Sequence, residues 1–206
     1  MSKKNTKKAP DSRGEATRER IISAAITAFA EKGFEAASTR DIAERAGEDQ
    51  GLLTYHFPSK DKLWRAAADR LFGDQAKLFE PLITSLEFDD PKERARAAIR
   101  EYVHFAAAHP ETFRFMVDEG NQSNARMRWL VDTHLKPRFE FMKTHGVVGA
   151  TGMDESLAHH AFYALAGAGS FIFAVAPKCR RLSGLDPRKR EAVETHAEFI
   201  ANLMVP

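Results

Sequence analysis

Apolar residues recur along this chain with the spacing of helices. The first clear case is an apolar face built from residues three or four positions apart: Ile22, Ala25, Ile26, Phe29 and Ala30. This period predicts a helix that begins near Thr17. Gly33 is expected to end it, because glycine readily adopts the left-handed conformation that follows a helix. Since no stretch alternates between apolar and polar residues as a strand would, we predict an all-α protein of about nine helices.

Two short helices joined by a tight turn are predicted next. Ser38 can cap the first, with Asp41 three residues later completing a capping-box-like pair. Gly47 closes this helix after barely two turns, and Asp49 can cap the second helix, over 50–57. Two such helices make a helix-turn-helix. A second helix of this length fits the major groove of DNA, which is about 12 Å wide.

Longer helices are predicted for the rest of the chain. The next one begins at Lys60, behind the capping residue Ser59, and extends to about Phe79. Beyond it, helices are expected over 91–108, 110–120, 125–145, 155–177 and 187–204. Pro137 interrupts an otherwise continuous apolar pattern, so we expect a kink or a break there.

The charge is distributed unevenly along the 206 residues, although the net charge is only +2. Residues 1–65 hold 13 Lys and Arg against 10 Asp and Glu, whereas the remainder is close to neutral. A mildly basic head is compatible with phosphate binding, but a solvated surface gives the same balance. Residues 1–13 are polar and basic without periodicity, which predicts a disordered tail. This tail could be solubilising or could be an arm that reaches DNA.

The cysteine content and the distribution of apolar residues indicate the cellular compartment that we expect for this protein. Cys179 is the single cysteine, so no intramolecular disulfide can form, which suits a reducing cytosol. Met1 to Asn5 is followed by polar residues and not by the apolar stretch of a signal peptide. The longest apolar run, Ala164 to Ala176, is shorter than the roughly 20 residues that a membrane span needs. We therefore expect a soluble, cytoplasmic protein with no membrane partner.

The N-terminal motifs resemble those of a regulator family. The matching pieces are the end of the first helix (Phe29, Lys32, Gly33, Phe34), Ser38-Thr39-Arg40-Asp41-Ile42-Ala43, Ala46-Gly47, and Tyr55-His56-Phe57-Pro58-Ser59-Lys60. Their combination closely resembles the DNA-binding domain of TetR/AcrR transcriptional regulators. The resemblance implies a helix-turn-helix domain over 14–60, behind the basic tail 1–13. It also implies a helical effector-binding and dimerisation domain over 61–206.

The resemblance further implies which residues contact a double-stranded DNA operator. They are Ser38, Thr39, Arg40, Gln50, Gly51, Leu52, Thr54, Tyr55, His56 and Lys60. The first three begin a helix, whose N-terminus favours an anion such as phosphate. Tyr55, His56 and Lys60 should also contact phosphate. The four residues between, on the outer side of the third helix, are the base-reading candidates: Gln50 can bond an adenine edge and Leu52 can meet a thymine methyl.

Three residues depart from the pattern usual in the family. Glu48 stands where a small apolar residue is common, Asp49 replaces a serine or a similar residue, and Thr54 replaces a frequent aromatic. Acids beside DNA would repel phosphate unless they are turned aside. Asp49 has a role as a helix cap, where an acid is favourable. For Glu48 the sequence offers no explanation.

Neither a metal site nor a catalytic site is predicted. The eight histidines form no HExxH or ExxH pattern. Gly167-Ala168-Gly169 follows no strand and lies inside an apolar run, so it is not a nucleotide-binding loop. No Ser–His–Asp arrangement can be argued from the sequence. We therefore expect no cofactor and no enzymatic activity.

An effector pocket is predicted in the C-terminal part, where 11 of the 15 phenylalanines lie at or beyond Phe79. Aromatic side chains can line an apolar pocket between helices, although each of them could equally be ordinary core. The candidates are Phe105, Phe113, Trp129, His134, Phe139, Phe162 and Tyr163. His134 falls on an apolar face, where a core histidine and a ligand contact are both possible.

The last two helices are expected to form a homodimer interface. The final helix, which starts at Asp186 and Pro187, presents Val193, Ala197, Ile200, Leu203 and Met204 at helical spacing. The interpretation is a dimeric repressor that binds a palindromic operator and is released by a small apolar effector. The alternative is a helical enzyme or lipid-binding module whose N-terminal helices are only structural. It requires polar residues that converge in the C-terminal part.

Overall fold

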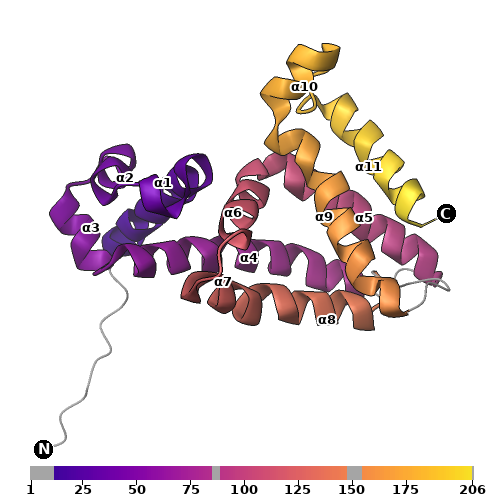
Figure 1. The fold of residues 1–206 in the computed structure, drawn as a ribbon, viewed down its shortest axis with the longest axis horizontal. Coiled ribbons are helices and arrows are strands. Elements are labelled where there is room, and N and C mark those ends of the chain that lie inside the picture. The colour runs from indigo at the N-terminus through magenta and orange to yellow at the C-terminus, as the bar shows by residue number, and fades with distance from the viewer. Residues whose placement is uncertain (1–11, 85–88, 148–154, 206) are drawn as a thin grey trace, which may run out of the picture. The chain divides into compact units, whose positions relative to one another are not determined.

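The computed structural model describes residues 12–84, 89–147 and 155–205, and within these ranges all regular structure is helical (Figure 1). The predicted all-α fold is confirmed. The chain divides into two compact units, Met1–Ala67 and Ala68–Pro206. The division therefore lies a few residues beyond the predicted boundary between 60 and 61, inside a helix and not at its start.

The first unit contains three helices and the beginning of a fourth: α1 (Ser12–Ala36), α2 (Thr39–Ala46), α3 (Gln50–His56) and α4 (Lys60–Thr84). Ser12 and Arg13 of the predicted tail already belong to α1, and the rest of that tail lies outside the described residues. Gly33, which was expected to end the first helix, has a φ of 72° and kinks α1, which continues to Ala36. The core of this unit is formed by buried side chains that include Ile21, Ile22, Phe29, Ile42, Leu53, Phe57, Leu63 and Trp64.

Side-chain caps begin the two short helices. The Ser38 hydroxyl accepts hydrogen bonds from the backbone N–H groups of Arg40 (3.2 Å) and Asp41 (3.4 Å). Asp41 does not complete the expected capping box. Its carboxylate instead binds Lys32 at 2.8 Å and Arg45 at 3.3 Å, and the Lys32 hydrogen bond contributes most to lowering the pKa of Asp41. Charged partners thus replace the backbone N–H that a capping box would supply.

The turn between α2 and α3 depends on Gly47, which lies in the left-handed region with a φ of 69°. Its backbone N–H bonds the Glu44 carbonyl, and the next N–H, of Glu48, bonds the Ala43 carbonyl at 3.0 Å. This pair of bonds satisfies carbonyl groups that the helix end would otherwise leave open. Asp49 then caps α3, accepting the backbone N–H of Leu52 at 2.8 Å.

The second unit continues α4 and adds the remaining helices. They are α5 (Pro91–Ala108), α6 (Pro110–Gly120), α7 (Ala125–Leu130), α8 (Lys136–Thr144), α9 (Ala158–Ala174), α10 (Ala176–Ser183) and α11 (Arg190–Met204). Helix α5 packs against both α9 and α11 (Figure 1). Their shared core includes Ile99, Val103, Leu165, Phe173, Ala197, Ile200 and Ala201. Ile200 is 2% exposed, so most of the face of α11 that the sequence assigned to a dimer interface belongs to this core, whereas Leu203 is 60% exposed.

The predicted helix over 125–145 is broken where Pro137 was expected to disturb it. A π-helical segment, Val131–Leu135, separates α7 from α8, and the backbone N–H of Lys136 bonds the Val131 carbonyl. Pro137 has no N–H to continue the α-helical ladder, so a wider turn precedes it. The expected break is therefore present as a π-helical turn.

Two predicted boundaries near the C-terminus are wrong. The helix expected over 155–177 ends at Ala174, and α10 follows it at a bend of 74°. Pro177, in the first turn of α10, was the available signal. The last helix starts at Arg190 and not at Pro187, because the Asp186 carboxylate accepts the N–H of Arg188 (3.1 Å) and forms a turn of its own.

The apolar helices near the C-terminus are short relative to a bilayer. In the described part of the chain, no single helix is both long and apolar enough to cross a membrane. Helices α9 and α10 meet the length and composition requirement only together, across their bend.

Replacing Gly47 tests the turn of the helix-turn-helix. Gly47→Ala should lower the free energy of unfolding by about 1–2 kcal/mol, because a side chain disfavours the left-handed backbone even where space is available. No heavy atom of the described residues lies within 4 Å of a Cβ at this position. Urea unfolding followed by circular dichroism measures the effect. Gly120→Ala is the matched control, since its added Cβ is equally unhindered and its φ is not positive. Equal effects of the two substitutions would contradict the assignment of strain to Gly47.

Candidate functional site

Helix α3 has one face buried in the core and one face open to solvent. Leu53 and Phe57 are 1% and 5% exposed and anchor the helix. The predicted base-reading residues Gln50, Gly51 and Thr54 are exposed on the other side, whereas Leu52 is half-buried. Tyr55 is 81% exposed, which is unusual for a large aromatic side chain. A two-turn helix with this outer face has the shape that major-groove reading requires.

The two acidic residues before α3, Glu48 and Asp49, have structural roles. Asp49 holds the N-terminus of α3, and a Cβ on Gly51 would lie 3.0 Å from its Oδ1, so glycine leaves room for this cap. The Glu48 carboxylate, unexplained by the sequence, forms an ion pair with Arg20 of α1 (Nε–Oε1 3.1 Å). Its side chain is only 12% exposed. Both acids therefore have partners within this unit.

Some of the predicted DNA contacts are brought together in a shallow depression of the first unit. Ser38 and Thr39 from the start of α2, Thr54 from α3 and Lys60 from α4 line it. The Thr54 hydroxyl donates to the Gln50 carbonyl (2.8 Å), so toward DNA it is available as an acceptor only. The Lys60 ammonium donates to the Glu35 carbonyl (3.1 Å) and lies 4.6 Å from the Phe34 ring centre. The other predicted contacts lie outside this depression: Arg40, Gln50, Gly51, Leu52, Tyr55 and His56.

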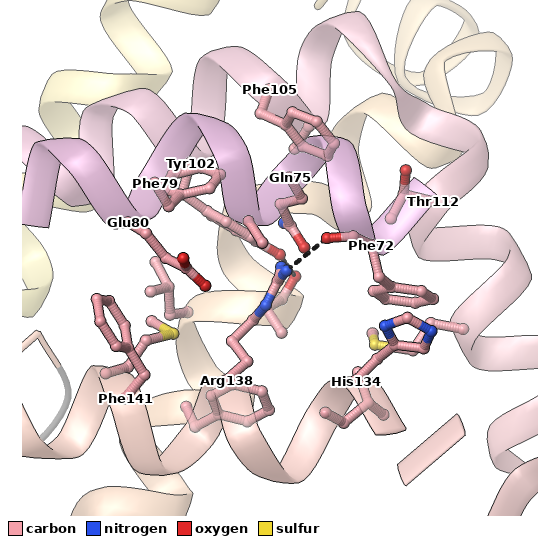
Figure 2. A pocket seen from close by; sticks show the side chains of 18 of the residues that line it. Phe72, Gln75, Phe79, Glu80, Tyr102, Phe105, Thr112, His134, Arg138 and Phe141 are labelled. Atoms are coloured by element: carbon pink, nitrogen blue, oxygen red, sulfur yellow. Dashed lines mark hydrogen bonds between the residues drawn. The ribbon is translucent and has the colours of Figure 1, made fainter. Parts of the chain in front are cut away.

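The second unit encloses a cavity of about 400 Å³ between α4, α5, α6, the π-helical segment, α8 and α9 (Figure 2). Most of its wall is apolar, with side chains that include Phe72, Phe79, Ile83, Phe105, Phe113, Met116, Phe141, Met142, Phe162 and Leu165. A volume of this size lies in the range of small-molecule sites. The cavity therefore suits a mainly apolar ligand.

A few polar groups interrupt this apolar wall. The Arg138 guanidinium points from α8 into the cavity and donates to the Phe72 carbonyl at 2.9 Å (Figure 2). Its burial lowers the pKa of Arg138 to about 10. The Tyr102 and Ser170 hydroxyls share a hydrogen bond of 2.7 Å, and burial raises the pKa of Tyr102. The Tyr102 ring packs so closely on Gly169 that a Cβ there would lie 2.9 Å from it, so α9 needs glycine at this position.

His134 lines the cavity and contacts Asp69 of α4. Its Nε2 lies 2.9 Å from Oδ1 of Asp69, and its ring stacks on Phe72 with centres 5.4 Å apart. The Trp129 ring meets it edge-on at 5.3 Å. Burial lowers the pKa of His134, and the Asp69 hydrogen bond only partly opposes this shift. The neutral imidazole is thus the form that the fold favours.

Comparison with known proteins identifies the first unit. The model of the bacterial regulatory proteins of the tetR family matches residues 21–67. This segment of the chain is similar to that family. The HTH-type transcriptional dual regulator CecR of Shigella flexneri is 37% identical to this chain over 93 residues, which are 44% of this chain and 41% of CecR. The chain spans less than two thirds of the length of the curated relatives that it matches first.

A likeness of fold extends over most of the chain. The fatty acid degradation regulator FadR of Bacillus halodurans aligns with a TM-score of 0.70 at 18% identity, over 91% of this chain and 97% of FadR. FadR of Bacillus subtilis, solved in complex with stearoyl-CoA, aligns with a TM-score of 0.66 at 19% identity, over 91% of this chain and 97% of that one. These proteins are named as regulators, the class that the sequence predicted for this chain.

Only some of the predicted effector residues line the cavity. Phe105, Phe113, His134 and Phe162 line the cavity. The others lie outside it: Trp129 packs on His134, Phe139 meets the Phe162 ring at 5.5 Å, and Tyr163 is 73% exposed. Helical spacing shows which residues share a face, but not which neighbouring helix that face meets.

Polar cavity residues were missed by the sequence analysis: Gln75, Tyr102, Thr112, Arg138 and Ser170. A signal was available for Gln75, which shares the apolar face of α4 with Phe72 and Phe79 at helical spacing. Arg138 directly follows Pro137 within an apolar pattern. A polar residue on an apolar face marks a position where burial has to be compensated.

The pH dependence of stability tests the environment of His134. The free energy of unfolding should fall as the pH drops through about 6.5, because the unfolded chain then binds a proton that folded His134 resists. His134→Gln should reduce this slope between about pH 7 and about pH 5, measured by urea unfolding at several pH values. His196 shows the same direction of shift, caused first by burial, so His134→Gln/His196→Gln should flatten the slope further. An unchanged slope in both variants would contradict the assigned environments.

Proposed function

We propose that this chain is a homodimeric transcriptional repressor that binds a palindromic operator and is released by a small, largely apolar effector. The observation that carries the proposal is the pairing of an open helix-turn-helix face in one unit with an enclosed apolar cavity in the other. Helix α4 contributes to both, with Lys60 in the first unit and Phe72 and Phe79 in the cavity wall. A ligand in the cavity therefore touches the same helix that begins beside the proposed DNA surface.

The DNA-binding part rests on how the first unit displays its polar groups. Gln50 and Thr54 are exposed on α3, and Arg40 is exposed at the start of α2. The pairing of Glu48 with Arg20 removes a negative charge that would oppose phosphate. The regulators that share the matched segment, CecR among them, support the assignment of this surface to DNA.

The effector part rests on the chemistry of the cavity. An effector shifts an equilibrium only when it binds one state better than the other. A ligand that fills the space between α4 and α8 would favour the arrangement of α4 that fits it, and DNA would favour another. The stearoyl-CoA bound to Bacillus subtilis FadR supports a ligand with a hydrocarbon portion. This coupling is reciprocal, so operator DNA would weaken effector binding by the same factor.

The dimer part rests on exposed apolar side chains of α9 and α11, two helices that pack against each other. Tyr163 is 73%, Phe199 62% and Leu203 60% exposed, while Ile200 on the adjacent face is buried. Large exposed apolar groups that gather on neighbouring helices indicate a protein interface. Two-fold symmetry would then separate two α3 helices by about one turn of DNA, roughly 34–36 Å.

Two single substitutions separate phosphate binding from base reading. Lys60→Ala should weaken binding to operator and random DNA by a similar factor, because a lysine on a phosphate releases counterions whatever the sequence. It should also reduce the salt slope by about one unit for each phosphate that is no longer neutralised. Gln50→Ala should cost about 1–3 kcal/mol on the operator only, since an amide bonded to a base releases no counterion.

Fluorescence anisotropy across a salt series measures both variants on operator and random DNA. Identical behaviour of Lys60→Ala and Gln50→Ala would contradict the reading role of α3. If the parent protein does not bind DNA at low salt, with no effector present, the proposal that it is a transcriptional regulator is refuted.

Two sets of substitutions on α11 test the dimer. Phe199→Asp with Leu203→Asp should yield a folded monomer, because the new charges lie on an exposed face. Ile200→Asp should instead destabilise the protein by about 3 kcal/mol or more, since it buries a charge in the core. Light scattering with circular dichroism distinguishes the two effects. A dimer unchanged by the double substitution would place the interface elsewhere.

A further inference from the structure

The guanidinium of Arg138 has no counterion in the described part of the chain. Its hydrogen bond goes to the backbone carbonyl of Phe72, and no carboxylate of the described residues forms an ion pair with it. The negative charge of Glu80, in the cavity wall, favours the charged form of Arg138. However, Glu80 is exposed and its carboxylate is not bonded to Arg138. A guanidinium has five N–H donors in a planar fork, so most of the donors of Arg138 remain available.

A second polar group lies at the same place. The Gln75 side chain extends from α4 toward the Arg138 guanidinium (Figure 2), although only 6% of Gln75 is exposed. No hydrogen bond joins its amide to another described residue. Elsewhere in the cavity wall the buried Thr112 hydroxyl is likewise without a partner among the described residues. Buried polar groups are normally hydrogen-bonded, so these groups indicate a missing polar partner in the cavity.

The missing partner has to supply negative charge and acceptor atoms. A buried cation without a counterion is costly, and an anion that enters the cavity removes that cost. One guanidinium supplies one positive charge, and the nearby Glu80 carboxylate disfavours a dianion such as a phosphate monoester. A carboxylate carries one charge and two oxygens in the plane that matches the guanidinium fork. Most of the remaining wall, including Phe105, Phe113 and Met116, is apolar.

We propose that the cavity binds an amphipathic carboxylic acid, with its carboxylate on the Arg138 guanidinium and the Gln75 amide and its hydrocarbon part among the aromatic side chains. This inference rests on the proposed function, because it names the class of the effector. It predicts that a free acid binds more tightly than a neutral derivative such as a thioester. The carbonyl of a neutral derivative would leave the Arg138 charge without a counterion.

The test compares decanoate with methyl decanoate on the full-length protein by isothermal titration calorimetry. The parent protein should bind decanoate about tenfold to hundredfold more tightly, the range expected for a charge-assisted hydrogen-bonded pair. Arg138→Met should abolish this preference and leave the ester affinity unchanged. Arg138→Lys should retain part of it, since the charge remains but the fork is lost. Gln75→Leu should lower the decanoate affinity alone.

The matched control is Arg100→Met, which removes an arginine of α5 that is ion-paired with Glu198 (2.6 Å) and does not line the cavity. It should keep the full preference for decanoate. An equal affinity of the parent protein for acid and ester, or a preference that survives both Arg138→Met and Gln75→Leu, would overturn the proposal. If Arg138→Met does not fold, Arg138→Lys and Gln75→Leu decide.

A DNA-release assay distinguishes this inference from the proposed function. Release of the operator by decanoate, lost in Arg138→Met, supports both. Release by decanoyl-CoA but not by decanoate overturns the carboxylate and leaves the ligand-responsive regulator intact. Tight, Arg138-dependent binding of decanoate without any effect on DNA binding supports the carboxylate site and overturns its role as the effector site.

Discussion

The missing N–H group of Pro137 shapes the cavity more than any other single feature of the second unit. An α-helical turn cannot pass through this position with its hydrogen bonds intact, and the chain widens into the π-helical segment Val131–Leu135 before α8 begins. Almost every residue from Thr133 to Arg138 then lines the cavity, including His134. One face of a regular α-helix would present only about half of such a run. The π turn thus brings an imidazole and a guanidinium into the same apolar enclosure.

The charges of the protein show how unusual the position of Arg138 is. Two carboxylates that are largely removed from solvent have an opposite charge beside them: Glu48 is paired with Arg20, and the buried Glu119 carboxylate with Arg126 at 3.2 Å. Arg138 has only a backbone carbonyl. A fold that pairs these enclosed charges but leaves Arg138 open at a cavity has an electrostatic requirement that a ligand can meet.

Helix α4 begins in the first unit and continues into the second. Its first turn, capped by Ser59, places Lys60 in the proposed DNA surface. Further along, Asp69 binds His134, Phe72 accepts the Arg138 hydrogen bond and Gln75 faces the same guanidinium. One proposed DNA contact, Lys60, and one proposed ligand contact, Gln75, therefore belong to the same helix.

The sequence by itself determined the parts that depend on local interactions. The caps Ser38 and Asp49, the left-handed turn at Gly47 and the disturbance at Pro137 involve groups a few residues apart, and each was predictable from residue type and spacing. Only the tertiary structure decided which faces meet. Ile200 and Phe199 are neighbours on α11, yet one is core and the other exposed. Glu48 is paired with Arg20, and Gln75 faces Arg138, and in each case the two residues lie far apart in the sequence. Such pairings depend on how helices pack, and helical periodicity gives the direction of a side chain without naming its partner.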